Sequence, residues 1–306
     1  MADRIVVFGT GGTIAGRGRG PQDHVGYRSG EVPVGDLLAG IPVPAGLRVD
    51  VEQLAQVDSK DMDTRVWATL VARCAEALAR DDVRAVVVTH GTDTLEETAY
   101  LLHRCVPARK PVVLTCAMRP ATALSPDGPQ NLADALVVAA QDGARGVLLA
   151  CAGRVHGAVG LRKVHPYRLD PFESGDAGVV GYVEDSRWRA ARDWPVAATD
   201  PVPVGEGDWP WVAIVVSHAG ADARQVDALV REGVRGIVVA GTGNGTVHHA
   251  LASALRAASA RGVRVVRTTR CAEGRVVDGG RDGGFETLPL TPVQARVELQ
   301  LQLQAA

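Results

Sequence analysis

Short apolar runs alternate with stretches of helical periodicity along the first part of the chain. The runs are rich in β-branched residues and apolar on both faces, as in buried strands of a parallel sheet. They lie at residues 4–9, 83–89, 111–116 and 146–151. Between them, apolar residues recur three and four positions apart, which predicts helices at residues 63–79, 95–105 and 131–141. This alternation predicts a parallel sheet with crossover helices.

The pattern is interrupted between Trp188 and Pro210, where Pro, Asp and Trp are frequent and no periodicity is visible. Such a segment is typical of a linker. We expect Trp194, Trp209 and Trp211, which flank it, to cover a seam between domains. The strand–helix alternation then resumes, with strands expected at residues 212–216, 236–240 and 263–268 and helices at 222–232, 247–261 and 291–302.

The sequence therefore predicts an α/β protein with two α/β domains. Residues 1–187 form the larger N-terminal domain, with a parallel-type sheet and crossover helices, and would carry the chemistry. Residues 188–210 form the linker. Residues 211–306 form a smaller, flavodoxin-like α/β domain.

Composition narrows the choice of partners and compartment. The net charge of −2 in 306 residues gives no global attraction to nucleic acid or to an anionic membrane. No apolar stretch approaches the ~20 residues of a transmembrane helix, and no signal peptide precedes the first strand. The cysteines are widely spaced and odd in number, without a CxxC pair. This favours reduced thiols in a cytoplasmic protein without a metal site.

Three polar segments follow predicted strands, at the sheet edge where open α/β sheets bind ligands. They are GTGGTIAG (9–16), THGTDT (89–94) and AMRP (117–120). The first lacks GxGxxG and contains two threonines, so a phosphate-binding turn and an exposed hydroxyl nucleophile both remain open. In the second, Asp93 or Thr94 is suited to cap the following helix, and acidic residues occupy its first turn.

Several motifs together resemble the bacterial-type L-asparaginase family of the asparaginase/glutaminase superfamily, in its cytoplasmic, type I-like form. They are TGGTIAG (10–16), SKDM (59–62), HGTDTLEETAYLL (90–102), AMRP before SPDGPQNL (125–132), KVHPYRLDPFES (163–174), AGTGNG (240–245) and ARVELQLQL (295–303). They follow the family's order over nearly the whole chain. The resemblance implies an amidohydrolase that converts L-asparagine to L-aspartate and ammonia through a threonine nucleophile and an acyl-enzyme, with minor glutaminase activity and no cofactor.

The resemblance also assigns roles to residues. Thr13 matches the nucleophile, and a hydroxyl needs an adjacent base to act as one. Thr92, Lys163 and Asp93 match the activating group. Tyr27 matches a tyrosine on a mobile loop, and the glycine-rich segment 16–30 is suited to be a lid. The residues expected to contact substrate are Ser59, Lys60, Asp93, Thr92, Gly12 and Ala117, with no metal.

The resemblance implies that Asp93 binds the ammonium group of the substrate. Ser59 and nearby backbone N–H groups would bind its carboxylate. Backbone N–H groups near Thr13 and Thr92 would stabilise the oxyanion. His90 is expected to be structural. Arg119 is expected to anchor its loop by an ion pair with Asp127.

The chain departs from the family pattern at three places. Lys60 stands where many members have glutamine, and lysine cannot accept a hydrogen bond from the substrate ammonium. This predicts weak affinity or a preference for a different amide. Two alternatives are that Lys60 reaches the substrate carboxylate or that it pairs with Asp61. Asp278 is the nearest candidate for an acidic residue that the family takes from a neighbouring subunit. Thr246 replaces an asparagine that often follows GNG.

Other functions are compatible with parts of the sequence. A catalytically weak or inactive amino-acid-binding sensor would keep the fold, and Lys60 favours it. An amidotransferase subunit acting on charged tRNA usually carries an extra N-terminal domain, and a nucleotide-binding oxidoreductase requires the resemblance to be accidental. The family implies a homo-oligomer built as a dimer of dimers, with a small-molecule substrate and no nucleic-acid or membrane partner.

Overall fold

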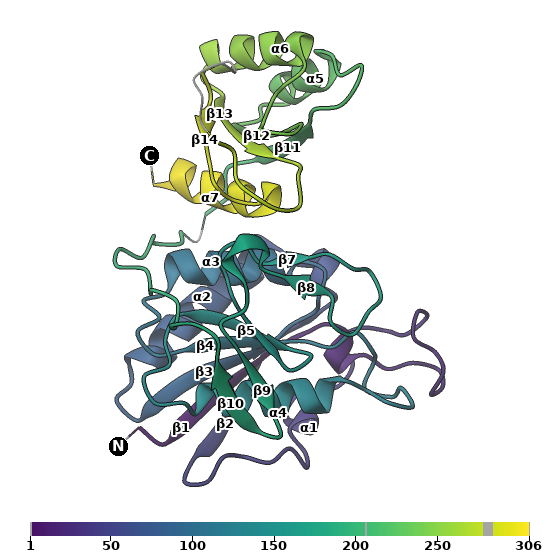
Figure 1. The fold of residues 1–306 in the computed structure, drawn as a ribbon, viewed down its shortest axis with the longest axis vertical. Coiled ribbons are helices and arrows are strands. Elements are labelled where there is room, and N and C mark those ends of the chain that lie inside the picture. The colour runs from purple at the N-terminus through teal and green to yellow at the C-terminus, as the bar shows by residue number, and fades with distance from the viewer. Residues whose placement is uncertain (1, 206, 278–283, 306) are drawn as a thin grey trace. The chain divides into compact units, whose positions relative to one another are not determined.

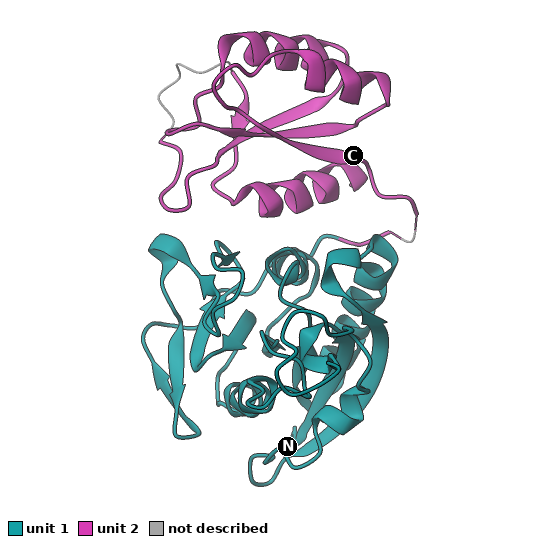
Figure 2. Ribbon diagram, turned by 90° about the vertical axis from the view of Figure 1, so that its right-hand side faces the viewer, with its two compact units in different colours: residues 1–202 teal, residues 203–306 magenta. Residues whose placement is uncertain are grey.

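The computed structural model describes residues 2–205, 207–277 and 284–305. The chain divides into two compact units, residues 1–202 and 203–306, which Figure 2 colours separately. Each unit has its own sheet flanked by helices (Figure 1). The predicted α/β class, with a larger first unit and a smaller second one, is confirmed.

An eight-stranded sheet forms the centre of unit 1, in the order β10-β9-β6-β5-β4-β3-β1-β2. The strands from β2 to β5 pair in parallel, and β6, β9 and β10 extend the sheet in antiparallel pairing. The strands are β1 (Arg4–Gly11), β2 (Arg48–Val57), β3 (Val83–Thr89), β4 (Val112–Thr115), β5 (Val147–Cys151), β6 (Arg154–Gly157), β9 (Gly181–Glu184) and β10 (Arg187–Ala190). A separate ribbon consists of β7 (Arg162–Lys163) and β8 (Phe172–Glu173).

Helices cover both faces of this sheet. Alternate side chains of β1 point to opposite faces, so Ile5 and Val7 join a core with the helix after β4, while Val6 and Phe8 face the helix after β2. The α-helices are α1 (Val34–Leu37), α2 (Thr64–Ala79), α3 (Leu95–Cys105) and α4 (Gly128–Ala139). The 3-10 helices are η1 (Thr13–Ala15), η2 (Ser59–Asp61) and η3 (Gly175–Ala177).

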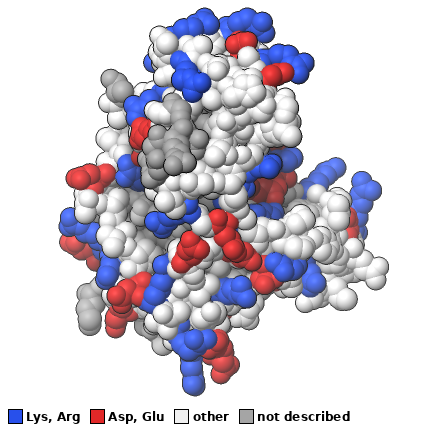
Figure 3. All heavy atoms as spheres, turned by 45° about the horizontal axis from the view of Figure 1, so that its top comes forward, with Lys and Arg blue, Asp and Glu red and all other residues white. Residues whose placement is uncertain are grey.

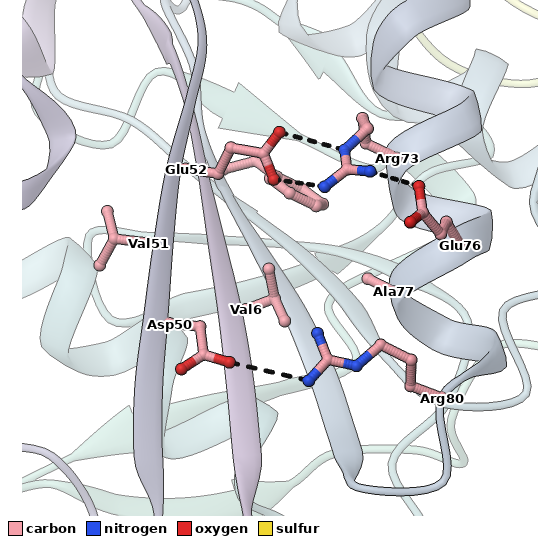
Figure 4. Close-up of a pocket in the computed structure, with 9 residues that line it drawn as sticks. Val6, Asp50, Val51, Glu52, Arg73, Glu76, Ala77 and Arg80 are labelled. Carbon is pink, nitrogen blue, oxygen red and sulfur yellow. Dashed lines mark hydrogen bonds and ion pairs between the residues drawn. The ribbon is translucent and has the colours of Figure 1, made fainter.

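The edge strand β2 was not expected from the apolar pattern because its sequence, RVDVEQLAQV, is charged. Its carboxylates are taken up by arginines instead. Glu52 accepts hydrogen bonds from Arg73 of α2 at 2.6 and 3.1 Å, and Asp50 lies 3.8 Å from Arg80. Figure 4 shows these pairs around a cavity of about 100 Å³. Charges on an edge strand also discourage pairing with another chain.

The segment expected to be a linker begins inside unit 1. Trp188 lies in β10, which pairs with β9, and Val202 donates its backbone N–H to Arg104 O at 2.9 Å. The rings of Trp188 and Trp194 stack with their centroids 4.6 Å apart, against the core of unit 1. Trp194 therefore packs against the core of unit 1, and its expected place at a seam between domains stays a prediction.

Unit 2 contains four strands in the order β11-β12-β13-β14, all paired in parallel. One core lies between the sheet and α5 and α6, and a second lies between the sheet and α7. The elements are β11 (Val212–Val216), α5 (Arg224–Arg231), β12 (Gly236–Gly241), α6 (His249–Ala260), β13 (Arg264–Thr269), β14 (Glu286–Thr287) and α7 (Pro292–Gln304). None of the helices in the described ranges has both the length and the apolar character needed to cross a membrane.

Candidate active site

Two glycine-containing turns meet at the carboxyl ends of β1 and β3. β1 ends at Gly11 and Gly12 follows it, with φ of 102° and 80°, a conformation that favours glycine. A Cβ on Gly12 would lie 2.2 Å from Gly91 Cα, so the two backbones touch and only glycine fits. This approach brings the turn carrying Thr13 against the turn carrying Thr92.

Thr13 opens η1 directly after the glycines and is almost fully buried, at 7% exposure. Its Oγ1 lies 2.6 Å from the hydroxyl oxygen of Tyr27, within hydrogen-bond distance. The Tyr27 ring packs over Gly16, where a Cβ would lie 2.8 Å from the ring. The structure thus brings together the expected nucleophile and the expected loop tyrosine.

Lys163 reaches the second turn from the β7–β8 ribbon. Its Nζ donates to Thr92 Oγ1 at 2.8 Å and to Asp93 Oδ1 at 2.6 Å. The Lys163 side chain is 15% exposed, whereas that of Asp93 is 53% exposed. Asp93 therefore pairs with the lysine while keeping a face open to solvent. The three residues of the expected activating group form one connected set.

Ser59 is buried beside the same turn. Its Oγ accepts the Asp93 backbone N–H at 3.1 Å, and its carbonyl accepts the Thr94 hydroxyl at 2.7 Å. A Cβ on Gly91 would lie 2.4 Å from Ser59 Oγ, so this glycine is needed to admit the serine. Thr94 is the N-cap of α3, but its side chain serves Ser59 instead of the helix.

Lys60 is directed to its neighbouring carboxylates. Its Nζ lies 2.5 Å from Asp61 Oδ2 and 3.4 Å from Asp58 Oδ2, and its side chain is 60% exposed. The hydrogen bond to Asp61 raises the pKa of the Lys60 ammonium above its ordinary value. The pairing with Asp61 considered from the sequence is therefore present.

The glycine-rich segment 16–30 is tied down along its length. Arg17 and Arg28 bridge each other, and the N–H of Gly18 donates to Thr122 Oγ1 at 2.8 Å. The N–H of Leu124 donates to the Pro21 carbonyl at 2.9 Å. These contacts hold the segment over the Thr13 turn, which is the position that a closed lid would occupy.

Asp127 organises the turn after β4. Its carboxylate accepts the backbone N–H groups of Met118 and Arg119, each at 2.9 Å. The guanidinium of Arg119 donates to the Ser125 carbonyl instead, at 3.0 Å. The expected ion pair between Arg119 and Asp127 is therefore corrected: the anchor exists, but it acts through backbone N–H groups. Ala117 is fully buried in a cluster with Ile14, and its contact with a ligand remains a prediction.

His90 belongs to a buried hydrogen-bonded chain that the sequence did not reveal. Trp67 Nε1 donates to Thr98 Oγ1 at 2.9 Å, and Thr98 Oγ1 lies 3.0 Å from His90 Nε2. His90 Nδ1 lies 2.7 Å from the Gly91 carbonyl. Burial lowers the pKa of His90 to about 4, so the ring is neutral, with Nδ1 donating and Nε2 accepting. The chain fixes the Gly91 peptide.

Glu96 makes a contact that the sequence did not indicate, because an acid at this position is expected simply to favour the start of the helix. Its Oε2 accepts the backbone N–H of Lys163 at 3.0 Å. A carboxylate in the first turn of a helix is ordinary, so only the fold shows that this one faces the lysine strand.

The remaining expectations concern charge, metals and unit 2. Among the described residues, no group of His, Cys, Asp and Glu is arranged to hold a metal ion. Basic and acidic side chains both occur across the face in Figure 3. Thr246 bonds to Thr242 at the end of β12. Asp278 lies outside the described residues. All the cysteines are free thiols, as expected.

Several known proteins are similar to this chain in sequence and fold. Residues 4–195 match the family model for asparaginase, N-terminal, and residues 211–306 match the glutaminase/asparaginase C-terminal domain. The chain is 37% identical over 310 residues to the probable periplasmic L-asparaginase of Haemophilus influenzae, covering 98% of this chain and 88% of the relative. It is 33% identical over 280 residues to the glutaminase-asparaginase of Pseudomonas fluorescens, covering 89% and 77%. The crystal structure of the probable cytoplasmic L-asparaginase from Campylobacter jejuni has a TM-score of 0.92 and 34% identity, covering 99% of this chain and 95% of that one.

Proposed function

The chain belongs to the asparaginase family, and on this premise we propose that it hydrolyses L-asparagine to L-aspartate and ammonia, with Thr13 as nucleophile and L-glutamine as a minor substrate. The observation that carries the proposal is the meeting of two hydrogen-bonded sets on touching turns. One is Thr13 with Tyr27, and the other is Thr92 with Lys163 and Asp93.

The substrate's α-amino and α-carboxylate groups would bind to donors and acceptors of the site that still have hydrogen-bonding capacity. Ser59 Oγ accepts one hydrogen bond from Asp93 N–H and still has its own proton to donate, which suits the substrate carboxylate. Asp93 presents a half-exposed carboxylate, which suits the substrate ammonium. These contacts would place the side-chain amide over the Thr13 turn.

The first step makes an ester and releases ammonia. Thr13 Oγ1 attacks the amide carbon, and its proton passes to the Tyr27 oxygen that already lies 2.6 Å away. Tyr27 gives its own hydroxyl proton to the leaving nitrogen as the carbon–nitrogen bond breaks. Backbone N–H groups of the two turns stabilise the oxyanion, at roughly 3 kcal/mol per donor in comparable sites.

The second step hydrolyses the ester. Water attacks the ester carbonyl, and its proton passes through Thr92 Oγ1 to Lys163 Nζ, which lies 2.8 Å from it and must enter this step as the neutral amine. Asp93 stabilises the ammonium that forms on Lys163. The carbon–oxygen bond to Thr13 breaks, the proton returns to Thr13, and L-aspartate leaves.

The test is ammonia release from L-asparagine and L-glutamine. We expect release from asparagine by the wild type, its loss in Thr13→Ala, and wild-type rates in Thr69→Ala, which removes an exposed hydroxyl on α2. A ligand-induced shift in melting temperature without ammonia release would instead indicate an amino-acid sensor. Unchanged turnover in Thr13→Ala would reject the nucleophile.

We further propose a cytoplasmic homo-oligomer, assembled as a dimer of dimers, in which a neighbouring chain supplies an acidic residue such as Asp278. Support comes from the absence of a disulfide among the described cysteines and from similarity to the Campylobacter jejuni protein, named as cytoplasmic, although the Haemophilus influenzae relative is named as periplasmic. Sedimentation velocity measures the assembly, and a monomer that retains full turnover would contradict it.

A further inference from the structure

Lys163 lies on a structurally isolated strand. β7 contains only Arg162 and Lys163 and pairs only with the equally short β8, outside the eight-stranded sheet. Ladder bonds with β8 therefore cannot by themselves fix Lys163 against the turn of Thr92, which precedes it by 71 residues. A contact between this ribbon and the turn or helix α3 must set the position of the amine.

Glu96 provides that contact. Its Oε2 accepts the Lys163 backbone N–H at 3.0 Å, from the first turn of α3. Thr92 and Asp93, which bind the Lys163 amine, precede α3 by only a few residues. The lysine is thus held at its backbone and at its amine by one short segment.

The surroundings of Glu96 argue against a role in capping alone. Burial raises the pKa of Glu96 to about 7, an effect opposed by the hydrogen bond from Lys163 N–H. The charged groups around it are Glu97 on the same helix and Arg162 and Lys163 on β7, with Glu173 opposite Arg162 on β8. Glu97 also lies in the first turn and can serve the helix dipole. A carboxyl group at position 96 that is only partly ionised near neutral pH contributes little to this interaction with the helix dipole.

We propose that Glu96 is the positioning residue for Lys163: it docks the β7–β8 ribbon onto α3 and so sets the distance between the lysine amine and Thr92. Its effect on turnover rests on the proposed function, because Lys163 receives the proton of the hydrolytic water. Glu96 itself does not touch the reacting atoms. Substrate binding through Ser59 and Asp93 should be nearly independent of it.

Steady-state kinetics on asparagine test the consequence for turnover. We expect Glu96→Ala to lower kcat at least tenfold with KM within about threefold, because a displacement near 1 Å can cost up to ~100-fold. Glu96→Gln keeps an oxygen acceptor and should recover most of kcat. Glu97→Gln is the matched control on the same turn and should behave as wild type. Unchanged kcat in Glu96→Ala, or a loss of kcat in Glu97→Gln as large as that in Glu96→Ala, would overturn the proposal.

A second measurement tests the contact without turnover. The lysines of the chain are Lys60, Lys110 and Lys163, so labelling with [¹⁵N]lysine leaves few backbone amide signals to assign. We expect the Lys163 amide shift to titrate between pH ~6 and ~8 in the wild type and not in Glu96→Gln. Its hydrogen exchange should accelerate in Glu96→Ala, with the Lys110 amide unchanged as internal control.

The two measurements separate the possible failures. If the wild type releases no ammonia from asparagine, the proposed function fails, and the Lys163 amide still decides whether Glu96 holds the ribbon. If turnover is normal and the Lys163 amide neither titrates with Glu96 nor loses protection in Glu96→Ala, the positioning role is wrong.

Discussion

Thr13 Oγ1 and the Tyr27 hydroxyl lie 2.6 Å apart, although the chain between them runs through a glycine-rich segment tied to residues 121–124. In the proposed mechanism, the tyrosine can receive the threonine proton only while that segment lies over the Thr13 turn. In that mechanism the position of this segment is therefore coupled to activation of the nucleophile.

Tyr27→Phe should test this coupling. The ring still packs on Gly16, but the relay oxygen is lost, so we expect kcat to fall by about 100-fold or more with little change in KM. Tyr167→Phe, at a position that is 62% exposed, is the control and should retain wild-type kinetics. A Tyr27→Phe enzyme with wild-type kcat would mean that another group accepts the proton.

Lys60→Gln should improve binding of asparagine modestly. The Lys60 ammonium is already engaged by Asp61 and Asp58 and is largely exposed, so its repulsion of the substrate ammonium is screened. Interactions between exposed, screened charges are weak, so we expect KM to fall by only about two- to fivefold at constant kcat. Equal KM values for the wild type and Lys60→Gln would show that Lys60 does not affect substrate binding.

Thr98→Val should weaken both fold and activity. The substitution keeps the shape but removes the hydroxyl that joins Trp67 to His90, leaving the buried His90 Nε2 without its donor. We expect the free energy of unfolding to fall by about 1–3 kcal/mol and kcat to fall as the Gly91 peptide loosens. Thr98→Ser restores the hydroxyl and should recover both. Chemical denaturation and kinetics measure the two effects, and a Ser variant no better than Val would contradict the role of the hydroxyl.

His156 makes a pH-dependent contribution to stability in unit 1. Burial lowers its pKa from 6.5 to about 4, and its Nδ1 lies 2.7 Å from Ser174 Oγ. Because the folded state binds this proton less readily than the unfolded state, the contribution is present above pH 6.5 and is lost as pH falls toward 4. The span corresponds to about 3 kcal/mol at most. The free energy of unfolding, measured by denaturation at a series of pH values, should fall less steeply toward acid pH in His156→Gln than in the wild type. Equal slopes would exclude a contribution of His156 to this pH dependence.

The local pattern of apolar residues was sufficient to predict the strands that are buried on both faces and the helices that pack on them. It missed β2, because Asp50 and Glu52 break its apolar pattern and are neutralised by arginines from elsewhere in the fold. It also did not reveal that Trp188 and Trp194 stack on each other, because the segment around them shows no periodicity.

The site divides in the same way. Thr13, Thr92 and Lys163 were identified by resemblance to a family, since spacing alone cannot bring Lys163 to a turn 71 residues earlier. Residues that act through contacts left no such trace. Glu96 was noted only as an acid in the first turn of its helix, and Thr98 was not singled out. Their partners are set by tertiary packing, which local sequence does not record.

The most direct test of Thr13 as nucleophile is to trap the ester. Lys163→Met should stall hydrolysis of the acyl-enzyme, so acid quenching during incubation with asparagine, followed by peptide mass mapping, should find an aspartyl group on the peptide that contains Thr13. Thr13→Ala combined with Lys163→Met should show none. An adduct on the peptide of Thr92, or continued ammonia release by Thr13→Ala, would contradict the assignment.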